Sequence, residues 1–423
     1  MTALARVLPQ DDEPEGDPLG WGAVRPSSLL AATADRHPHR LAFHDQPGRE
    51  AWSGRPRIAW SYANTQRVVD RLATFLAGLG LPAGVPIGIC LPNGSEACVA
   101  LLAVERAGFI PCLLPVAWPE EVLGSAIESA NVCAVICQGR VAEERPAELF
   151  CRLAARYFGL RFICAFGPNV PDGVVDLDRA IVETEAGPLP PENPSHAGIV
   201  TFQKREGPPQ ALFRPFTSLV AAAAHFLVTE AVESNERILS LLAPDDHRGL
   251  VLGLTTSLVT GATLETVGLF EGAALDRALL DERPTRLVVP GFLEPALAEA
   301  DLPDSVISVI LVHEAPVRFK SRGDLKRAVT DVLAFGELAC LARTRGAVGH
   351  LTFSLDGEGG LPGTSEDLLR VRRDEDGVIH FAGAAAELYE FARGMPILPA
   401  QAPLWRSSGF KADLFAGIVI GVR

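Results

Sequence analysis

The chain has 423 residues, of which 48% are hydrophobic, and its 52 acidic residues against 38 lysines and arginines give a formal net charge of −14. A nucleic acid or an anionic membrane surface binds a basic face, so we expect neither as a partner. No apolar run reaches the roughly 18 residues of a membrane span, and the acidic N-terminal residues predict no signal peptide and a cytoplasmic location.

The eight cysteines predict no metal site. Most of them lie in apolar segments, and the closest pair, Cys133 and Cys137, lacks CxxC spacing and a second pair of ligands. Cysteines of this kind are typical of reduced thiols in a protein core. We therefore expect no metal centre.

The opening of the chain predicts a tail, a short helix and a hairpin. Residues 1–24 are rich in proline, glycine and acidic residues, which is typical of a flexible tail. Residues 28–37 predict a helix, and residues 41–45 and 57–62 predict two paired strands.

Short apolar strands and amphipathic helices then alternate along the chain. The predicted elements are helix 65–79, strand 87–91, helix 95–107, strand 108–114, helix 119–130 and strand 132–137. This alternation is typical of a parallel, doubly wound sheet. We assign residues 25–195 to this first α/β region, with the alternative that its opening hairpin joins the second subdomain.

The rest of the chain predicts a second α/β region and then a β-rich one. Residues 196–345 again alternate strands with helices, whereas short strands at 350–355, 368–373 and 378–381 follow without helices. The predicted fold class is therefore α/β, with two doubly wound, mainly parallel α/β subdomains plus a small β-rich subdomain, a distorted barrel, over residues 346–423.

The order of motifs resembles the AMP-dependent synthetase/ligase family. Leu-Gly-Leu-Pro-Ala-Gly at 79–84 is followed by Ile-Gly-Ile-Cys-Leu-Pro-Asn-Gly at 87–94 and Val-Ala-Leu-Leu-Ala-Val-Glu-Arg-Ala-Gly at 99–108, as at the opening of that family. The resemblance implies the large N-terminal domain of a protein whose relatives use ATP to convert a carboxylic acid to an acyl-adenylate. Such relatives often pass the acyl group to CoA or to a carrier protein.

The phosphate loop of that family, YTSGTTGxPKG, falls on residues 201–211. Only Gly207 and Pro209 match it, and Gln210 stands where the family has its lysine. Lys204 and Arg205 can hold an anion as point charges, although Glu206 beside them opposes this. We predict a solvated turn here, with nucleotide binding as the alternative.

Two further nucleotide contacts of the family are altered. His313-Glu314-Ala315 stands where the family has Gly-Gly-Ala, so side chains replace bare backbone beside the adenine. Because neighbours on a strand point to opposite faces, we do not expect His313 and Glu314 to form a catalytic pair.

Phe335-Gly336-Glu337 stands at the family's Tyr-Gly-x-Thr-Glu, where the Thr-Glu contacts the α-phosphate and magnesium. Leu338 and Ala339 replace the Thr-Glu, and Glu337 comes two residues early. Ring stacking on Phe335 is retained, but we expect no metal to be bound.

The end of the sequence also departs from the family. Phe410 replaces the Asp of the W-x-x-T-G-D motif that holds the ribose, and 421–423 resembles the hinge to a lysine-bearing C-terminal domain, which we expect to be absent unless a separate chain supplies it. His247 and Gly249 lie in a turn that shapes the acyl pocket of the family, and we take them as acyl-pocket candidates.

These substitutions predict a degenerate relative with no catalytic residues, which binds an acyl compound or a partner protein. One alternative is an active ligase with a phosphate site rebuilt around Lys204, Arg205 and Arg214 and a C-terminal domain supplied in trans. Only that alternative requires ATP or AMP with magnesium as cofactors and allows CoA as acceptor. Another alternative is a non-nucleotide small-molecule sensor that uses the pocket near His247.

Overall fold

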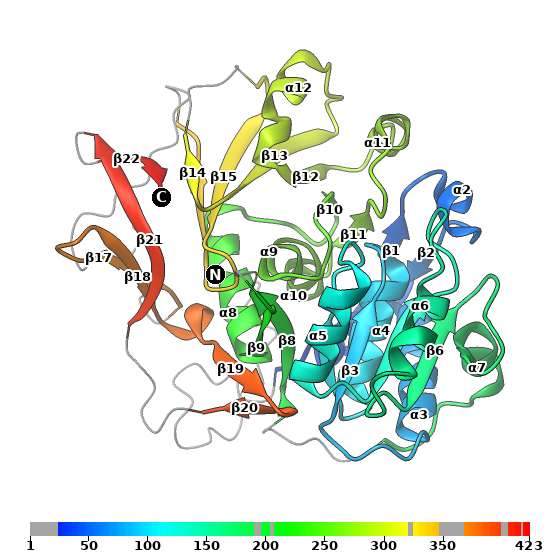
Figure 1. Ribbon diagram of the computed structural model, residues 1–423. Helices are drawn as coiled ribbons and strands as arrows, with labels where there is room; N and C mark the ends of the chain where they lie inside the picture. Colours follow the sequence, from blue (N-terminus) through cyan, green and yellow to red (C-terminus); the bar gives the residue numbers. More distant parts are fainter. Residues whose placement is uncertain are drawn as a thin grey trace.

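The computed structural model describes residues 24–189, 196–203, 207–319, 325–346, 368–398, 405–415 and 418–423. They form three β-sheets with helices between and around them (Figure 1). The α/β fold class predicted from the sequence is confirmed. No helix in these segments is long and apolar enough to cross a membrane.

A nine-stranded sheet forms the first layer. Its core strands β8, β4, β3, β5, β6 and β7 are parallel, and β9, β19 and β20 extend it antiparallel beyond β8. The strands in spatial order are β20 (Met395–Ile397), β19 (Tyr389–Ala392), β9 (Gln210–Pro215), β8 (Gly198–Gln203), β4 (Ile110–Leu113), β3 (Pro86–Cys90), β5 (Ala134–Gln138), β6 (Phe162–Phe166) and β7 (Val175–Asp176).

An eight-stranded sheet forms the second layer. The opening hairpin β1–β2 belongs to this sheet, because β1 pairs parallel with β11. The strands in spatial order are β16 (Cys340–Thr344), β15 (Ala328–Ala334), β13 (Val306–Glu314), β12 (Thr285–Pro290), β10 (Arg237–Ser240), β11 (Thr263–Thr266), β1 (Leu41–Asp45) and β2 (Ala59–Ser61).

The β-rich part is a five-stranded antiparallel sheet, which lies at the left of Figure 1 around the long strand β21. Two strands of the same stretch of chain, β19 and β20, cross over to the nine-stranded sheet. The predicted strand at 350–355 lies outside the described residues. The five strands in order are β14 (Val317–Arg318), β22 (Ile418–Val422), β21 (Arg406–Phe415), β18 (Val378–Ala382) and β17 (Arg370–Arg373).

Two apolar helices pack between the large sheets. Helix α4 (Ser95–Arg106) contacts β3 and β4 of one sheet and β1 of the other, and α8 (Phe216–Thr229) contacts β8, β9 and β16. Every residue of α4 from Ser95 to Glu105 is buried. A helix that is apolar on all sides is stable only in such a place, so these two helices form the centre of the core.

The remaining helices cover the sheets. The longest of them, α3 (Tyr62–Ala77), begins at Ser61, whose side chain accepts from the Asn64 N–H, and buries an apolar stripe that includes Val69, Leu72 and Leu76. The others are α1 (Pro26–Arg36), α2 (Arg49–Ser53), α5 (Glu120–Ala130), α6 (Pro146–Ala154), α7 (Leu177–Glu183), α9 (His247–Gly249), a π-helical turn (Leu250–Thr255), α10 (Thr256–Thr260), α11 (Gly272–Leu279) and α12 (Glu294–Glu299).

Candidate functional site

A cavity of about 740 Å³ lies where the three sheets meet. The carboxyl ends of parallel strands from both large sheets face it, which is where open α/β sheets bind their ligands. Strand β21 closes one side. The lining residues are Pro115, Ala117, Trp118, Phe202, Gln203, Leu212, Leu241, Leu242, Ala243, Asp245, Asp246, Arg248, Glu314, Ala315, Pro316, Phe335, Gly336, Glu337, Leu338, Leu388, Tyr389, Glu390, Arg406, Ser407, Ser408 and Phe410.

The structure brings five of the residues singled out in the sequence together in this wall. Glu314 ends strand β13 and Ala315 follows it, and Phe335, Gly336 and Glu337 lie in the turn between β15 and β16. Strands β13 and β15 are parallel neighbours, so the two segments lie side by side.

Two other sequence candidates, Gly207 and His313, do not line the cavity. Gly207 is exposed in the turn between β8 and β9, with a φ of +94°. His313 points away, and its Nε2 lies 2.9 Å from Asp331 Oδ1 below the sheet. Lys204 and Arg205 lie outside the described residues.

Glu314 reaches across the cavity wall to an arginine that the sequence analysis missed. Arg248 Nη1 donates to Glu314 Oε2 at 2.7 Å, and Arg248 Nε donates to Asp246 Oδ2 at 2.9 Å. The positive charge of Arg248 is therefore balanced by two carboxylates. This ion-pair bridge occupies the wall where the family has two glycines.

Glu337 is nearly enclosed, with 6% of its surface exposed. Thr201 Oγ1 of β8 donates to its carboxyl at 2.6 Å, and the backbone N–H of His247 also donates to it. Burial, helped by the negative charge of nearby Asp246, raises the pKa of Glu337 to about 7. A carboxyl that keeps its proton near neutral pH is a weak ligand for magnesium, which requires the carboxylate form.

The acyl-pocket candidates His247 and Gly249 lie directly behind the lining residues Asp246 and Arg248. His247 is buried, neither ring nitrogen has a hydrogen-bond partner, and burial together with the charges of Arg214 and Arg248 lowers its pKa. A Cβ on Gly249 would lie 1.7 Å from the Ala243 carbonyl oxygen, so only glycine fits there. Both residues shape the wall from behind.

Arg406 is the second lining residue that the sequence analysis missed. It follows Trp405 in the segment that resembles the W-x-x-T-G-D motif. This position in the motif is the feature of the sequence that could have identified Arg406 as a site residue. Its Nη1 donates to the Leu388 carbonyl at 2.6 Å, and its guanidinium lies 5.4 Å from the Tyr389 ring centre. It forms no ion pair with any carboxylate among the described residues, in contrast to Arg248.

Aromatic rings supply the apolar part of the cavity. Trp118 meets Phe202 edge to face with ring centres 5.5 Å apart, and Phe335 lies 6.2 Å from Phe410. Phe410 thus contributes a ring to the cavity lining. The cavity can accept a flat apolar group beside a polar end.

Arg214, proposed from the sequence as part of a rebuilt phosphate site, does not line the cavity. It is fully buried, and its Nη1 donates to Ser218 Oγ at 3.0 Å and to the Ala385 carbonyl at 3.3 Å. Its Nη2 donates to the Glu337 carbonyl, and burial lowers its pKa to about 10. Its contacts are those of a residue that fastens β9 to the turn at Glu337.

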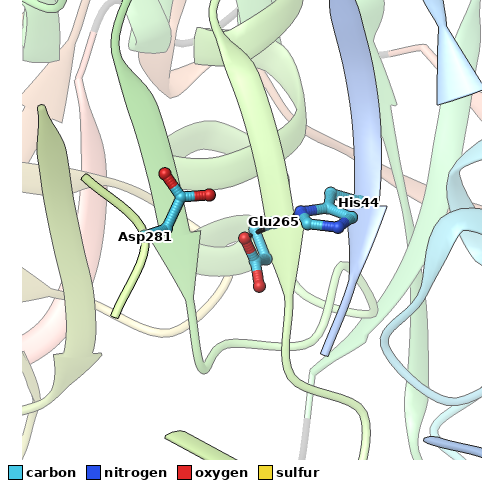
Figure 2. Close-up of side chains that lie close together, drawn as sticks. All are labelled: His44, Glu265 and Asp281. Atoms are coloured by element: carbon cyan, nitrogen blue, oxygen red, sulfur yellow. Dashed lines mark hydrogen bonds and ion pairs between the residues drawn. The ribbon is translucent and has the colours of Figure 1, made fainter. Parts of the chain in front are cut away.

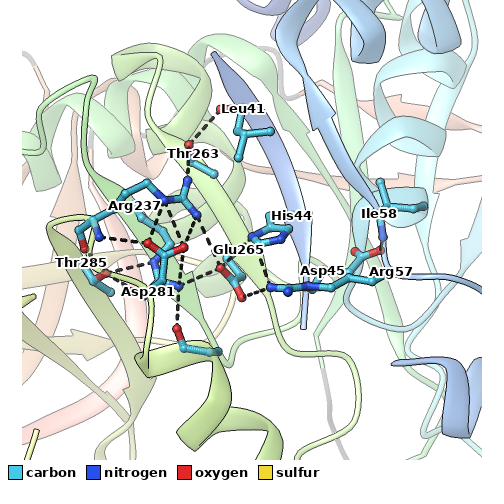
Figure 3. Close-up of polar contacts among 12 residues, drawn as sticks. Leu41, His44, Asp45, Arg57, Ile58, Arg237, Thr263, Glu265, Asp281 and Thr285 are labelled. Carbon is cyan, nitrogen blue, oxygen red and sulfur yellow. Dashed lines mark hydrogen bonds and ion pairs between the residues drawn. The ribbon is translucent and has the colours of Figure 1, made fainter. Parts of the chain in front are cut away.

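His44, Glu265 and Asp281 lie close enough together to be considered as metal ligands (Figure 2). Arginines already surround them, however, as Figure 3 shows. Arg237 lies 2.8 Å and Arg57 3.2 Å from Glu265, and Arg283 lies 2.7 Å from Asp281. Because these cations neutralise the carboxylates, the cluster does not fit a metal ion; it is an ion-pair network that joins β1 to β10 and β11.

Comparisons with known proteins agree with this fold. The family model for AMP-binding enzymes matches residues 30–157. Salicyl-AMP ligase / salicyl-S-ArCP synthetase of Mycobacterium tuberculosis is 28% identical over 57% of this chain and 42% of its own length. Novobiocin biosynthesis protein H of Streptomyces niveus is 25% identical over 66% of this chain and 45% of its own length. The chain therefore spans less than half of either relative.

Solved structures match almost the whole chain. The N-terminal subdomain of Klebsiella oxytoca NpsA, in complex with anthranilyl-AMSN, has a TM-score of 0.63 and 15% identity over 94% of this chain and 98% of its own. A benzoate CoA ligase from Burkholderia xenovorans LB400 has a TM-score of 0.71 and 16% identity over 94% of this chain and 79% of its own. The fold is that of the N-terminal domain of adenylate-forming ligases. Residues 30–157 match the family of AMP-binding enzymes, as the resemblance of the motifs predicted.

Proposed function

We propose that the chain is a non-catalytic relative of the adenylate-forming ligases that binds a small aryl carboxylic acid in the cavity. The supporting observation is the imbalance of charge in a cavity of about 740 Å³. Arg248 and Arg406 are the bases among the described lining residues, and they face the acids Asp245, Asp246, Glu314, Glu337 and Glu390. A site for the negatively charged triphosphate of ATP needs more cationic than acidic side chains.

The ligand class follows from two features of the cavity lining, its aromatic rings and Arg406. Trp118 and Phe202 offer edges and faces to a flat ring. Arg406, which has no carboxylate partner among the described residues, offers a guanidinium fork that suits a carboxylate. The relatives carry salicyl, anthranilyl and benzoate groups in their names, which fits an aromatic acid here.

Calorimetric titration with salicylate and benzoate tests the binding. We expect saturable heat with either acid, and at least about tenfold weaker binding in Arg406→Gln, because a hydrogen bond to a charged group is worth roughly 1.5–3 kcal/mol. Arg179→Gln is the matched control, since Arg179 is exposed on α7 and pairs with Glu183. Equal binding in both variants would show that Arg406 does not contact the acid.

A second measurement tests whether chemistry is lost. We expect no pyrophosphate exchange with ATP, magnesium and the bound acid, even when binding is saturated. Exchange above background would establish the ligase alternative with its rebuilt phosphate site. Binding without exchange is also the result expected of a small-molecule sensor. A sensor differs from the proposed function only in that it passes the binding event on to another molecule.

A further inference from the structure

Strand β17 and Trp405, the residue just before strand β21, bring two arginines and a tryptophan together at the five-stranded sheet. Val371, Ile379 and Phe381 of this sheet are buried in the core. Arg370 and Arg372 alternate with Val371 along β17, so they point to the opposite face. None of the three residues Arg370, Arg372 and Trp405 lines the cavity.

Both guanidinium groups lie against the same indole ring. The Arg372 guanidinium carbon is 4.4 Å and that of Arg370 5.5 Å from the centre of the Trp405 ring. Stacking of this kind holds the guanidinium planes in place and leaves their outer edges available to an acceptor. The pair is therefore ordered before any ligand arrives.

Neither arginine has a carboxylate partner among the described residues. In addition, the Nε atoms of Arg370 and Arg372 are both excluded from water and have no hydrogen-bond acceptor. An external acceptor can therefore meet these two guanidinium groups only at their Nη atoms.

Nearby acids do not cancel this charge. Asp374 is the acid that follows β17 directly, and it accepts from His380, with Nε2 and Oδ2 2.8 Å apart. His380 is the strand neighbour of Arg372, so the imidazole lies beside the guanidinium. Two guanidinium groups without a carboxylate partner among the described residues therefore lie against one indole, and His380 is the strand neighbour of one of them.

We propose that Arg370, Arg372 and Trp405 form a second ligand site that binds a phosphate group of a small phosphomonoester. One guanidinium fork satisfies a carboxylate, which has two oxygens, whereas two forks match the tetrahedral dianion of a phosphate. This site does not depend on the function proposed for the cavity, because it shares no residue with its lining.

Titration of the full chain with inorganic phosphate and with glycerol phosphate, at constant ionic strength, tests the site. We expect saturable heat for both, with the ester binding at least as tightly as the inorganic ion. Arg370→Gln and Arg372→Gln should each weaken phosphate binding by about tenfold or more, as expected for loss of one charged fork. Trp405→Phe keeps a ring for stacking and should weaken binding less.

Two control variants separate this site from other anion binding. Arg373→Gln removes the same charge from the next residue of the strand, which is exposed, and should leave phosphate binding within about twofold. Arg406→Gln should also leave it unchanged, which distinguishes the site from the cavity. No saturation by ~50 mM phosphate, or an equal loss in Arg373→Gln and Arg372→Gln, would overturn the proposal.

Discussion

The molecule uses arginine in opposite ways in two regions. At the junction of β1, β10 and β11, Glu265 is fully buried and lies within ion-pair distance of Arg237, Arg57 and His44 (Figure 3). On β21 and β17, which lie on either side of β18 in the five-stranded sheet, Arg406, Arg370 and Arg372 have no carboxylate partner among the described residues.

The paired arginines stabilise the fold, whereas the arginines without a carboxylate partner are suited to bind a ligand. A carboxylate surrounded by arginines has no charge left to offer a ligand, and its neighbours lock strands together. A guanidinium that contacts only carbonyl groups and aromatic rings keeps its full positive charge, so it can form an ion pair with an anionic ligand.

The largest effect is expected for Arg237→Met. Arg237 is 1% exposed and also donates to Thr285 Oγ1 and to the Ala278 carbonyl. Its removal leaves Glu265 buried with one strong partner fewer, which costs about 3–5 kcal/mol of unfolding free energy. Urea denaturation measures it, with Arg179→Gln as an exposed control expected to change less than about 0.5 kcal/mol. A loss below about 1 kcal/mol would mean that Arg57 and Arg283 suffice for the network.

Glu337→Gln should change how stability depends on pH. In the folded protein the pKa of the Glu337 carboxyl is about 7, whereas an ordinary glutamic acid has a pKa of 4.5. Between pH 4.5 and pH 7 the folded protein therefore binds one proton that the unfolded chain has lost. The stabilisation of the folded state by this proton is complete below pH 4.5, and it falls by about 3 kcal/mol as the pH rises to 7. The glutamine variant stays neutral and escapes this loss.

Urea midpoints at pH 5 and pH 8 measure the difference between variant and wild type. We expect the glutamine variant to gain stability relative to wild type on going from pH 5 to pH 8. Comparing the two proteins at each pH cancels the other titrating groups. A constant difference across that range would show that Glu337 titrates at its ordinary pKa.

Much of the fold could be predicted because it depends on local patterns. The apolar stripe of α3 and the continuous apolar run of β3 follow from sequence spacing, whereas α3 begins at Tyr62, inside the predicted strand 57–62. Strand alternation also places His313 and Glu314 on opposite faces, and their partners Asp331 and Arg248 lie on opposite sides of the sheet.

The site itself depends on contacts between distant residues, which local patterns do not contain. Thr201 and Glu337 are 136 positions apart, and they meet only because β8 and the β15–β16 turn end at the same cavity. Arg406 faces the cavity because β19 leaves the β-rich part and pairs with β9. Short antiparallel strands can join any free sheet edge, so the sequence alone does not specify that pairing.

The smallest effect is expected for Arg57→Gln, at the outer edge of the same network. The Arg57 side chain is 36% exposed, and its bond to Glu265 is 3.2 Å long, so water already shares its charge. We expect a loss of about 0.5–1 kcal/mol in urea denaturation, which should shrink further in ~0.5 M salt because exposed pairs are screened. Arg237→Met should keep its loss in the same salt, since ions do not reach a buried pair. A salt-independent loss above about 2 kcal/mol for Arg57→Gln would instead place Arg57 with the buried members of the network.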